Sequence, residues 1–284
     1  MKKLIIDTSG INALAADPDC DAIIRSLPVA YHVGITETVI AEVAAHPDDI
    51  ERNLLLDVME RLLKFGKCVN PYQLIIEQQA KAYHADPKDF EWWKVNVRFF
   101  EAEREVVVRE IINSVSDETR QSLRQWDRDY RAIFSTAKPT FQKLFEGGDG
   151  TRPSLREVTD ILLADGGAHL SIGANLMERA TGTRPPESEA KDFMERCPPF
   201  KALLSALCFS QYDRCIREER RESLGRAGRL DMFSSVYLAY CRVFVTNDDG
   251  QCKALKAVAE LVARVMEILM YDEFKAKLFG LPAR

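Results

Sequence analysis

Short apolar runs alternate with amphipathic stretches in the first part of the chain. The runs at 3–6 and 31–35 are typical of buried strands, and the segments 11–27, 36–45 and 54–65 have apolar residues at helical spacing. Small and polar residues follow each predicted strand, where they can end the strand and cap the next helix. Strands that alternate with helices predict an α/β fold with a parallel sheet.

The same alternation returns near the end of the chain. Helical spacing over 229–240 precedes an apolar run at 242–246, which predicts a further strand. A helix is expected at 249–263, a short strand at 265–269 and a last helix at 272–278. The two ends of the sequence therefore predict parts of one parallel sheet.

The middle of the chain has hardly any strand pattern. Helical stretches are expected there instead, at 72–84, 88–114, 118–146, 153–166, 187–196 and 198–222. The outer segments 1–66 and 220–284 together have the size of one ordinary domain. We therefore predict a three-layer α/β domain with a parallel sheet, interrupted by a large all-helical insertion at 67–219.

Composition and charge narrow the class of protein. Hydrophobic residues make up 46% of the 284 residues, which excludes a disordered chain. The 39 basic and 44 acidic residues leave a net charge of −5, so any basic surface for nucleic acid must be local. Seven scattered cysteines without a C-x-x-C pair predict free thiols in a reducing compartment. With no apolar run long enough to span a membrane, we expect a cytoplasmic protein without membrane contact.

Four acidic residues occupy positions where chemistry is expected in such a fold. Asp7 ends the first predicted strand, and Asp248 follows the strand at 242–246. Ligands of open parallel sheets bind beyond the carboxyl ends of the strands, so both acids should face one crevice. Asp231 begins the helix before that strand. Glu42 lies on the flank of the apolar stripe of the helix over 36–45, from where it can point into a cleft.

Each of these acids also has an ordinary structural explanation. Asp7 and Asp231 can stabilise helix N-termini, and Glu42 can be a solvated helix residue. The run Thr-Asn-Asp-Asp-Gly at 246–250 is a turn pattern. All four acids, in order and in matching strand and helix contexts, are much harder to explain as helix caps.

The motifs around these acids resemble those of PIN-domain nucleases. They read Leu-Ile-Ile-Asp-Thr-Ser at 4–9, Thr-Val-Ile-Ala-Glu at 38–42, Asp231, and Val-Thr-Asn-Asp at 245–248. The run at 265–269 followed by Asp-Glu-Phe at 272–274 resembles the closing strand and helix of that family. The resemblance covers only the outer segments. Glu42 and Asp231 are separated by far more than the few tens of residues usual in the family, which is a large departure.

Carboxylates gathered in one cleft repel each other unless a cation joins them. Oxygen ligands without His or Cys favour Mg²⁺ or Mn²⁺. The resemblance implies an endoribonuclease that hydrolyses single-stranded RNA to 5′-phosphate and 3′-hydroxyl ends. The expected catalytic residues and metal ligands are Asp7, Glu42, Asp231 and Asp248. Thr246 is expected to hydrogen-bond a ligand or phosphate, and Asp249 could be a fifth acid or a solvated turn residue.

Two further groups of residues could handle substrate. Six arginines lie between 214 and 229, and among them Arg217, Arg220 and Arg221 are the expected phosphate contacts. The alternative for this run is a solvated helix. The aromatic residues between 90 and 100 could stack bases or form the core of the insertion.

Three other functions remain open at this level. A PIN-like scaffold could bind RNA or a protein without cutting, and a homodimer is compatible with either function. The chain could also be the toxin of a toxin–antitoxin pair, although it is much longer than compact PIN toxins. A phosphatase of the haloacid-dehalogenase type is disfavoured, because it needs Asp-x-Asp where this chain has Asp-Thr-Ser at 7–9.

Overall fold

The computed structural model describes residues 1–95, 104–125, 153–213 and 232–280, together with positions 139, 141 and 143. Its centre is a five-stranded sheet in the order β3-β2-β1-β4-β5, and every neighbouring pair is parallel. The strands are β1 (Lys2–Ile6), β2 (Tyr31–Ile35), β3 (Lys67–Cys68), β4 (Val243–Thr246) and β5 (Glu267–Met270). The predicted α/β fold with a parallel sheet is confirmed.

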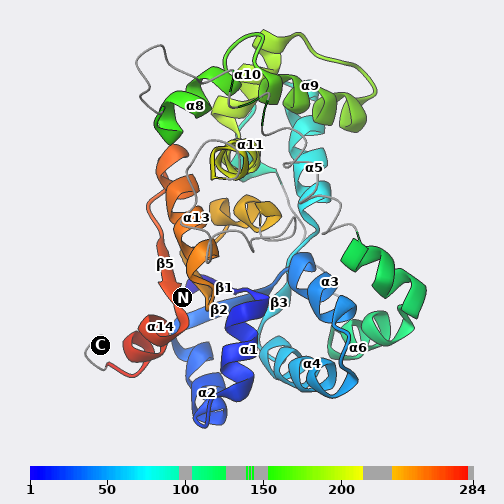
Figure 1. The fold of residues 1–284 in the computed structure, drawn as a ribbon, viewed down its shortest axis with the longest axis vertical. Coiled ribbons are helices and arrows are strands. Elements are labelled where there is room, and N and C mark those ends of the chain that lie inside the picture. Colours follow the sequence, from blue (N-terminus) through cyan, green and yellow to red (C-terminus); the bar gives the residue numbers. More distant parts are fainter. Residues whose placement is uncertain are drawn as a thin grey trace.

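Helices cover both faces of the sheet, because alternate strand residues point to opposite sides. Leu4, Ile6 and Val245 contribute to the hydrophobic core of one face. The helices packed there come mainly from the first part of the chain; in Figure 1, α1, α2 and α4 lie below the sheet, and α6 lies beside α3 and α4. They are α1 (Thr8–Ala16), α2 (Cys20–Ala30), α3 (Glu37–Ala45), α4 (Asp49–Leu63), α6 (Arg104–Ser114) and α14 (Tyr271–Leu278).

The opposite face is covered by a thicker helical layer, which extends to the top of Figure 1. Ile5, Phe244 and Ile268 from the sheet share one continuous core with Phe193 and Phe200 from the helices. The elements on this side are α5 (Tyr72–Ala85), η1 (Trp92–Lys94), α8 (Leu155–Leu162), α9 (Ala168–Thr181), α10 (Glu187–Arg196), α11 (Pro198–Gln211), η3 (Ser234–Ala239) and α13 (Asp249–Leu261). Much of the predicted insertion therefore packs directly on the sheet domain.

Several predicted elements need correction. The expected all-helical insertion begins with a strand, because Lys67–Cys68 pairs with β2 and forms the edge of the sheet. The α-helix expected from residue 88 is absent over 88–95, where a turn that includes Pro87 follows α5 and the 3₁₀ segment η1 comes next. The helix expected over 229–240 is, in its described part, mostly the 3₁₀ segment η3.

Helix α9 lies outside the predicted helical stretches, and its central Gly173 has a low helix propensity. Packing against α11 explains the glycine at this position. A Cβ on Gly173 would lie only 3.1 Å from Leu204 Cδ1 and 3.2 Å from the Phe200 ring. The glycine lets α9 approach α11 closely, and this contact outweighs its weak local preference for a helix.

Buried aromatic side chains join the helices on this side of the sheet. The Phe90 ring packs 5.3 Å from Tyr83 and 5.7 Å from Phe193, between ring centroids. Phe90 therefore belongs to the helical core, which is one of the two interpretations of the aromatic residues between 90 and 100. Trp93, in contrast, is exposed. No disulfide bond is formed among the described cysteines. Within the described ranges, we find no helix with the length and apolarity to cross a membrane.

Candidate active site at the carboxyl edge of the sheet

The candidate site lies where the strand order changes direction. The chain runs outward from β1 to β2 and β3, and it returns on the other side of β1 as β4 and then β5. Asp7 directly follows β1, and its backbone N–H donates to Val245 of β4 over 3.0 Å. Asp248 lies two residues beyond β4. Open α/β sheets bind ligands at such a switch point, so the sequence prediction for these two acids is consistent with the topology.

Asp7 is a buried carboxylate that is only half satisfied. It caps α1, and its Oδ1 accepts hydrogen bonds from the Gly10 N–H at 2.7 Å and the Ser9 hydroxyl at 2.9 Å. Its Oδ2 is buried without a hydrogen-bond partner among the described residues. Burial raises the pKa of Asp7 to about 6, although the nearby Thr246 hydroxyl, the Gly10 N–H and the Ser9 hydroxyl act to lower it, and the charge on Asp248 adds to the rise.

A chain of hydroxyl groups joins Asp7 to Asp248. The Ser9 hydroxyl accepts from the Asn247 N–H at 2.7 Å and lies 2.9 Å from the hydroxyl of fully buried Thr246. The Thr246 hydroxyl accepts from the Asp248 N–H at 3.1 Å. Asp248 caps α13 by accepting from the Gln251 N–H over 2.8 Å. Two helix N-termini and two carboxylates are thus held at one edge of the sheet.

Glu42 reaches the same edge from α3. Its carboxylate accepts a hydrogen bond from the Thr8 hydroxyl, and Thr8 is the residue after Asp7. One turn earlier on α3, the Thr38 hydroxyl lies 2.7 Å from that of Thr36 and 3.3 Å from that of Ser234. The structure therefore brings Glu42 to the start of α1, in contact with the residue that follows Asp7.

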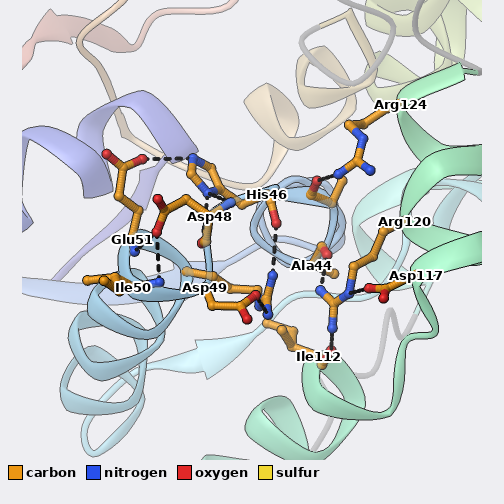
Figure 2. A network of polar contacts seen from close by, with 12 residues as sticks. Ala44, His46, Asp48, Asp49, Ile50, Glu51, Ile112, Asp117, Arg120 and Arg124 are labelled. Atoms are coloured by element: carbon orange, nitrogen blue, oxygen red, sulfur yellow. Dashed lines mark hydrogen bonds and ion pairs between the residues drawn. The ribbon is translucent and has the colours of Figure 1, made fainter.

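The end of α3 is fixed by arginines from the segment 117–125 (Figure 2). Buried Arg120 donates to the carbonyls of Ala44 and, over 2.9 Å, Ile112. Arg124 donates to the Ala45 carbonyl over 2.8 Å. Cationic donors at a helix C-terminus satisfy its last carbonyls and interact favourably with the helix dipole. The helix that carries Glu42 is thereby held by a segment of the predicted insertion.

Not every predicted site residue can be placed at this edge. Asp249 forms an exposed ion pair with Lys253 on the first turn of α13. This agrees with the expectation that Asp249 is a solvated residue and not a fifth acid of the site. The other unplaced residues lie outside the described part of the chain; they are Asp231, Arg217, Arg220 and Arg221.

Sequence reasoning missed several polar residues at this edge. Ser9, Thr38 and Ser234 supply hydroxyls, and the Glu37 carboxylate has a buried Oε2 without a hydrogen-bond partner among the described residues. Burial also raises the pKa of Glu37. The polar run Thr-Glu-Thr at 36–38, directly after a strand, is a signal that could have found two of them. Nothing local in the sequence indicates Ser234.

The described residues alone do not complete a metal centre. No three His, Cys, Asp or Glu side chains lie close enough to share a metal ion within the described ranges. The unpartnered Oδ2 of Asp7 nevertheless fits a hard cation, because a buried anionic oxygen without a donor is costly to leave bare. The donor set at this edge contains oxygen only, which suits Mg²⁺ or Mn²⁺.

Comparison with known proteins leaves the family open. The chain matches no family model, no curated protein and no solved structure. The resemblance to PIN-domain nucleases thus depends on the short acidic motifs.

Proposed function

We propose that the protein is a divalent-metal-dependent endoribonuclease with a PIN-like catalytic domain. The observation that carries the proposal is the unpartnered, buried carboxylate oxygen of Asp7, next to Asp248 at the switch point of a parallel sheet. A residue that only caps a helix needs one carboxylate oxygen, and Oδ1 already serves that purpose. The second oxygen is available for a ligand.

Four acidic residues are the proposed ligands of the cation. Asp7, Asp248 and Glu42 would hold Mg²⁺ or Mn²⁺ together with Asp231, directly or through water. The bound ion supplies an activated water and neutralises charge on the phosphodiester. The Ser9 hydroxyl donates to the Asp7 carboxylate, and the Thr246 hydroxyl accepts from the Asp248 backbone N–H. These hydrogen bonds fix the positions of the two aspartates. Thr8 orients the Glu42 carboxylate.

The proposed substrate is single-stranded RNA. The net charge of −5 repels a polyanion overall, so binding needs a local basic surface. Arg217, Arg220 and Arg221 are the proposed phosphate contacts, because guanidinium groups pair with phosphate in a bidentate way. An antitoxin or another protein that covers this edge would be a regulatory partner, and a homodimer is compatible with the proposal.

The purified protein should cleave a 5′-labelled single-stranded RNA when Mn²⁺ is present. Cleavage should stop with excess EDTA and return with excess Mn²⁺, because the carboxylates cannot activate water alone. Sequencing of RNA ends should find 5′-phosphate and 3′-hydroxyl groups. Cleavage that persists in EDTA, or 5′-hydroxyl products, would contradict the proposal. Binding without cleavage would identify a non-catalytic scaffold instead.

A further inference from the structure

A cavity is lined by residues of β1, β2 and β3 and extends from Lys3 to Val69, the residue after β3. Its volume is about 220 Å³. The strand register sets Lys3 beside His32, Ile5 beside Gly34, and Gly34 beside Lys67. In-register neighbours of a parallel sheet point to the same face, so these side chains gather on one side. It is the side on which Ile5 joins the core with Phe244.

The floor of the cavity is apolar. Ile5 and Val69 are buried there, and Gly34 lets Val69 lie directly against the sheet. A Cβ on Gly34 would lie only 2.8 Å from Val69 Cγ2, so a larger residue cannot occupy this position without movement. The Phe65 and Tyr240 side chains also line the cavity. The Tyr240 hydroxyl is already engaged, because it accepts from Gln79 Nε2 over 3.1 Å.

Basic side chains stand around this floor. Lys3, His32 and Lys67 line the cavity and are all exposed. The described lining contains neither aspartate nor glutamate. Burial raises the pKa of the Cys241 thiol, which also lines the cavity, and the charges of Arg264 and, less strongly, Lys3 act in the opposite direction. The cavity therefore combines an apolar interior with cationic donors at its mouth.

We infer that this cavity binds a small amphiphilic anion of the medium-chain carboxylate class. The apolar floor offers few hydrogen-bond partners, so a polar body such as a sugar or a base would be buried unsatisfied. A hydrocarbon tail on Ile5 and Val69 needs none. The carboxylate stays at the mouth, where Lys3 and Lys67 supply charge-assisted donors.

This site is separate from the proposed nuclease site. The cavity is lined by β1, β2 and β3, whereas Asp248 follows β4 on the other side of β1, and Lys3 lies four residues before Asp7, which corresponds to about 13 Å along an extended chain. A ligand held by Lys3 and Lys67 therefore lies on the β2 and β3 side of β1, and Asp248 lies on the β4 side. Binding in this cavity needs no divalent metal, so it does not depend on the proposed function.

The first test compares ligands on the unmodified chain. Amide signals in ¹H–¹⁵N NMR spectra are followed while octanoate is added in EDTA-containing buffer below its micelle concentration. We expect saturable one-site binding, with the largest shifts at Gly34, Lys67 and Val69. Octanol and octylammonium should bind at least about tenfold more weakly, because they lack the negative charge. Equal affinity of the three ligands, or shifts confined to other surfaces, would overturn the inference.

A matched set of variants tests the role of the lysines. The double variant Lys3→Gln with Lys67→Gln should weaken octanoate binding at least about fivefold, while Lys64→Gln should leave it unchanged. Lys64 is an exposed lysine three residues from Lys67, at the end of α4, and does not line the cavity. Circular dichroism checks the fold of each variant. Unchanged binding by a folded double variant would contradict the assignment of the anionic head.

Discussion

Replacing Asp7 with asparagine should reduce Mn²⁺-dependent RNA cleavage by at least about a thousandfold. Asparagine retains the shape of the side chain and can still accept from the Gly10 N–H, so the cap of α1 survives. It lacks the negative charge of the buried carboxylate, and with it the proposed hold on the metal. Loss of a group that stabilises transition-state charge typically costs factors of this size. The measurement is the initial rate of cleavage of a labelled single-stranded RNA.

Asp48→Asn is the matched control for this substitution. Asp48 also caps a helix, accepting from the Ile50 N–H at 2.8 Å and the Glu51 N–H at 3.0 Å, but it is exposed at the start of α4. Its replacement should leave cleavage unchanged, because the residue has only a capping role. If both variants kept full activity, Asp7 would be a helix cap and its catalytic assignment would be wrong.

The Asp7→Asn variant should also be more stable than the unmodified chain in metal-free buffer near pH 7, by about 1–2 kcal/mol. Burial raises the pKa of Asp7 from 3.8 to about 6, so ionising it in the folded state costs free energy. A shift of this size sets an upper bound of about 3 kcal/mol. The new amide N–H in the place of Oδ2 offsets part of the gain, because a buried donor in this position is itself costly unless it finds an acceptor.

The free energy of unfolding of the unmodified chain should fall as pH rises, because of this raised pKa. For an acid whose folded pKa lies above its unfolded pKa, the stabilising contribution is complete below about pH 4 and is lost as pH rises to about 6. The unmodified chain should therefore lose this contribution between pH 4 and pH 6, while Asp7→Asn should not. Urea unfolding in EDTA at several pH values measures the difference. A variant that is less stable at pH 7, with an unchanged pH profile, would contradict a strained carboxylate.

Added Mn²⁺ should reverse the order of the two stabilities. A cation that binds only the folded state stabilises it, and the chain with the complete carboxylate set should gain more than the variant. Asp48→Asn should respond to Mn²⁺ like the unmodified chain. If Mn²⁺ stabilised all three proteins equally, Asp7 would have no role in metal binding, even with a raised pKa.

The strand ends of the site were predictable because their signals are local. Asp7 and Asp248 each follow an apolar run and precede a helix, and both cap that helix in the structure. The same local logic predicts the sheet itself, apart from β3. That strand has only two residues, Lys67 and Cys68, which is too short for a hydrophobic pattern to be recognised.

Contacts between distant segments were not predictable in this way. Arg120 holds the end of α3 from 76 residues away, and Ser234 meets Thr38 across 196 residues. Neither contact leaves a spacing in the sequence. Helix α9 likewise depends on packing at Gly173, which a propensity argument counts against a helix. Tertiary contacts therefore decided what the local patterns could not.

Direct titration with Mn²⁺, followed by the electron paramagnetic resonance signal of the free ion, tests the central claim that the carboxylates at this edge hold a divalent cation. The unmodified chain and Asp48→Asn should remove Mn²⁺ from solution with the same stoichiometry and affinity. Asp7→Asn should bind at least about tenfold more weakly, because one charged oxygen ligand is lost. Identical binding curves for Asp7→Asn and the unmodified chain would contradict the claim.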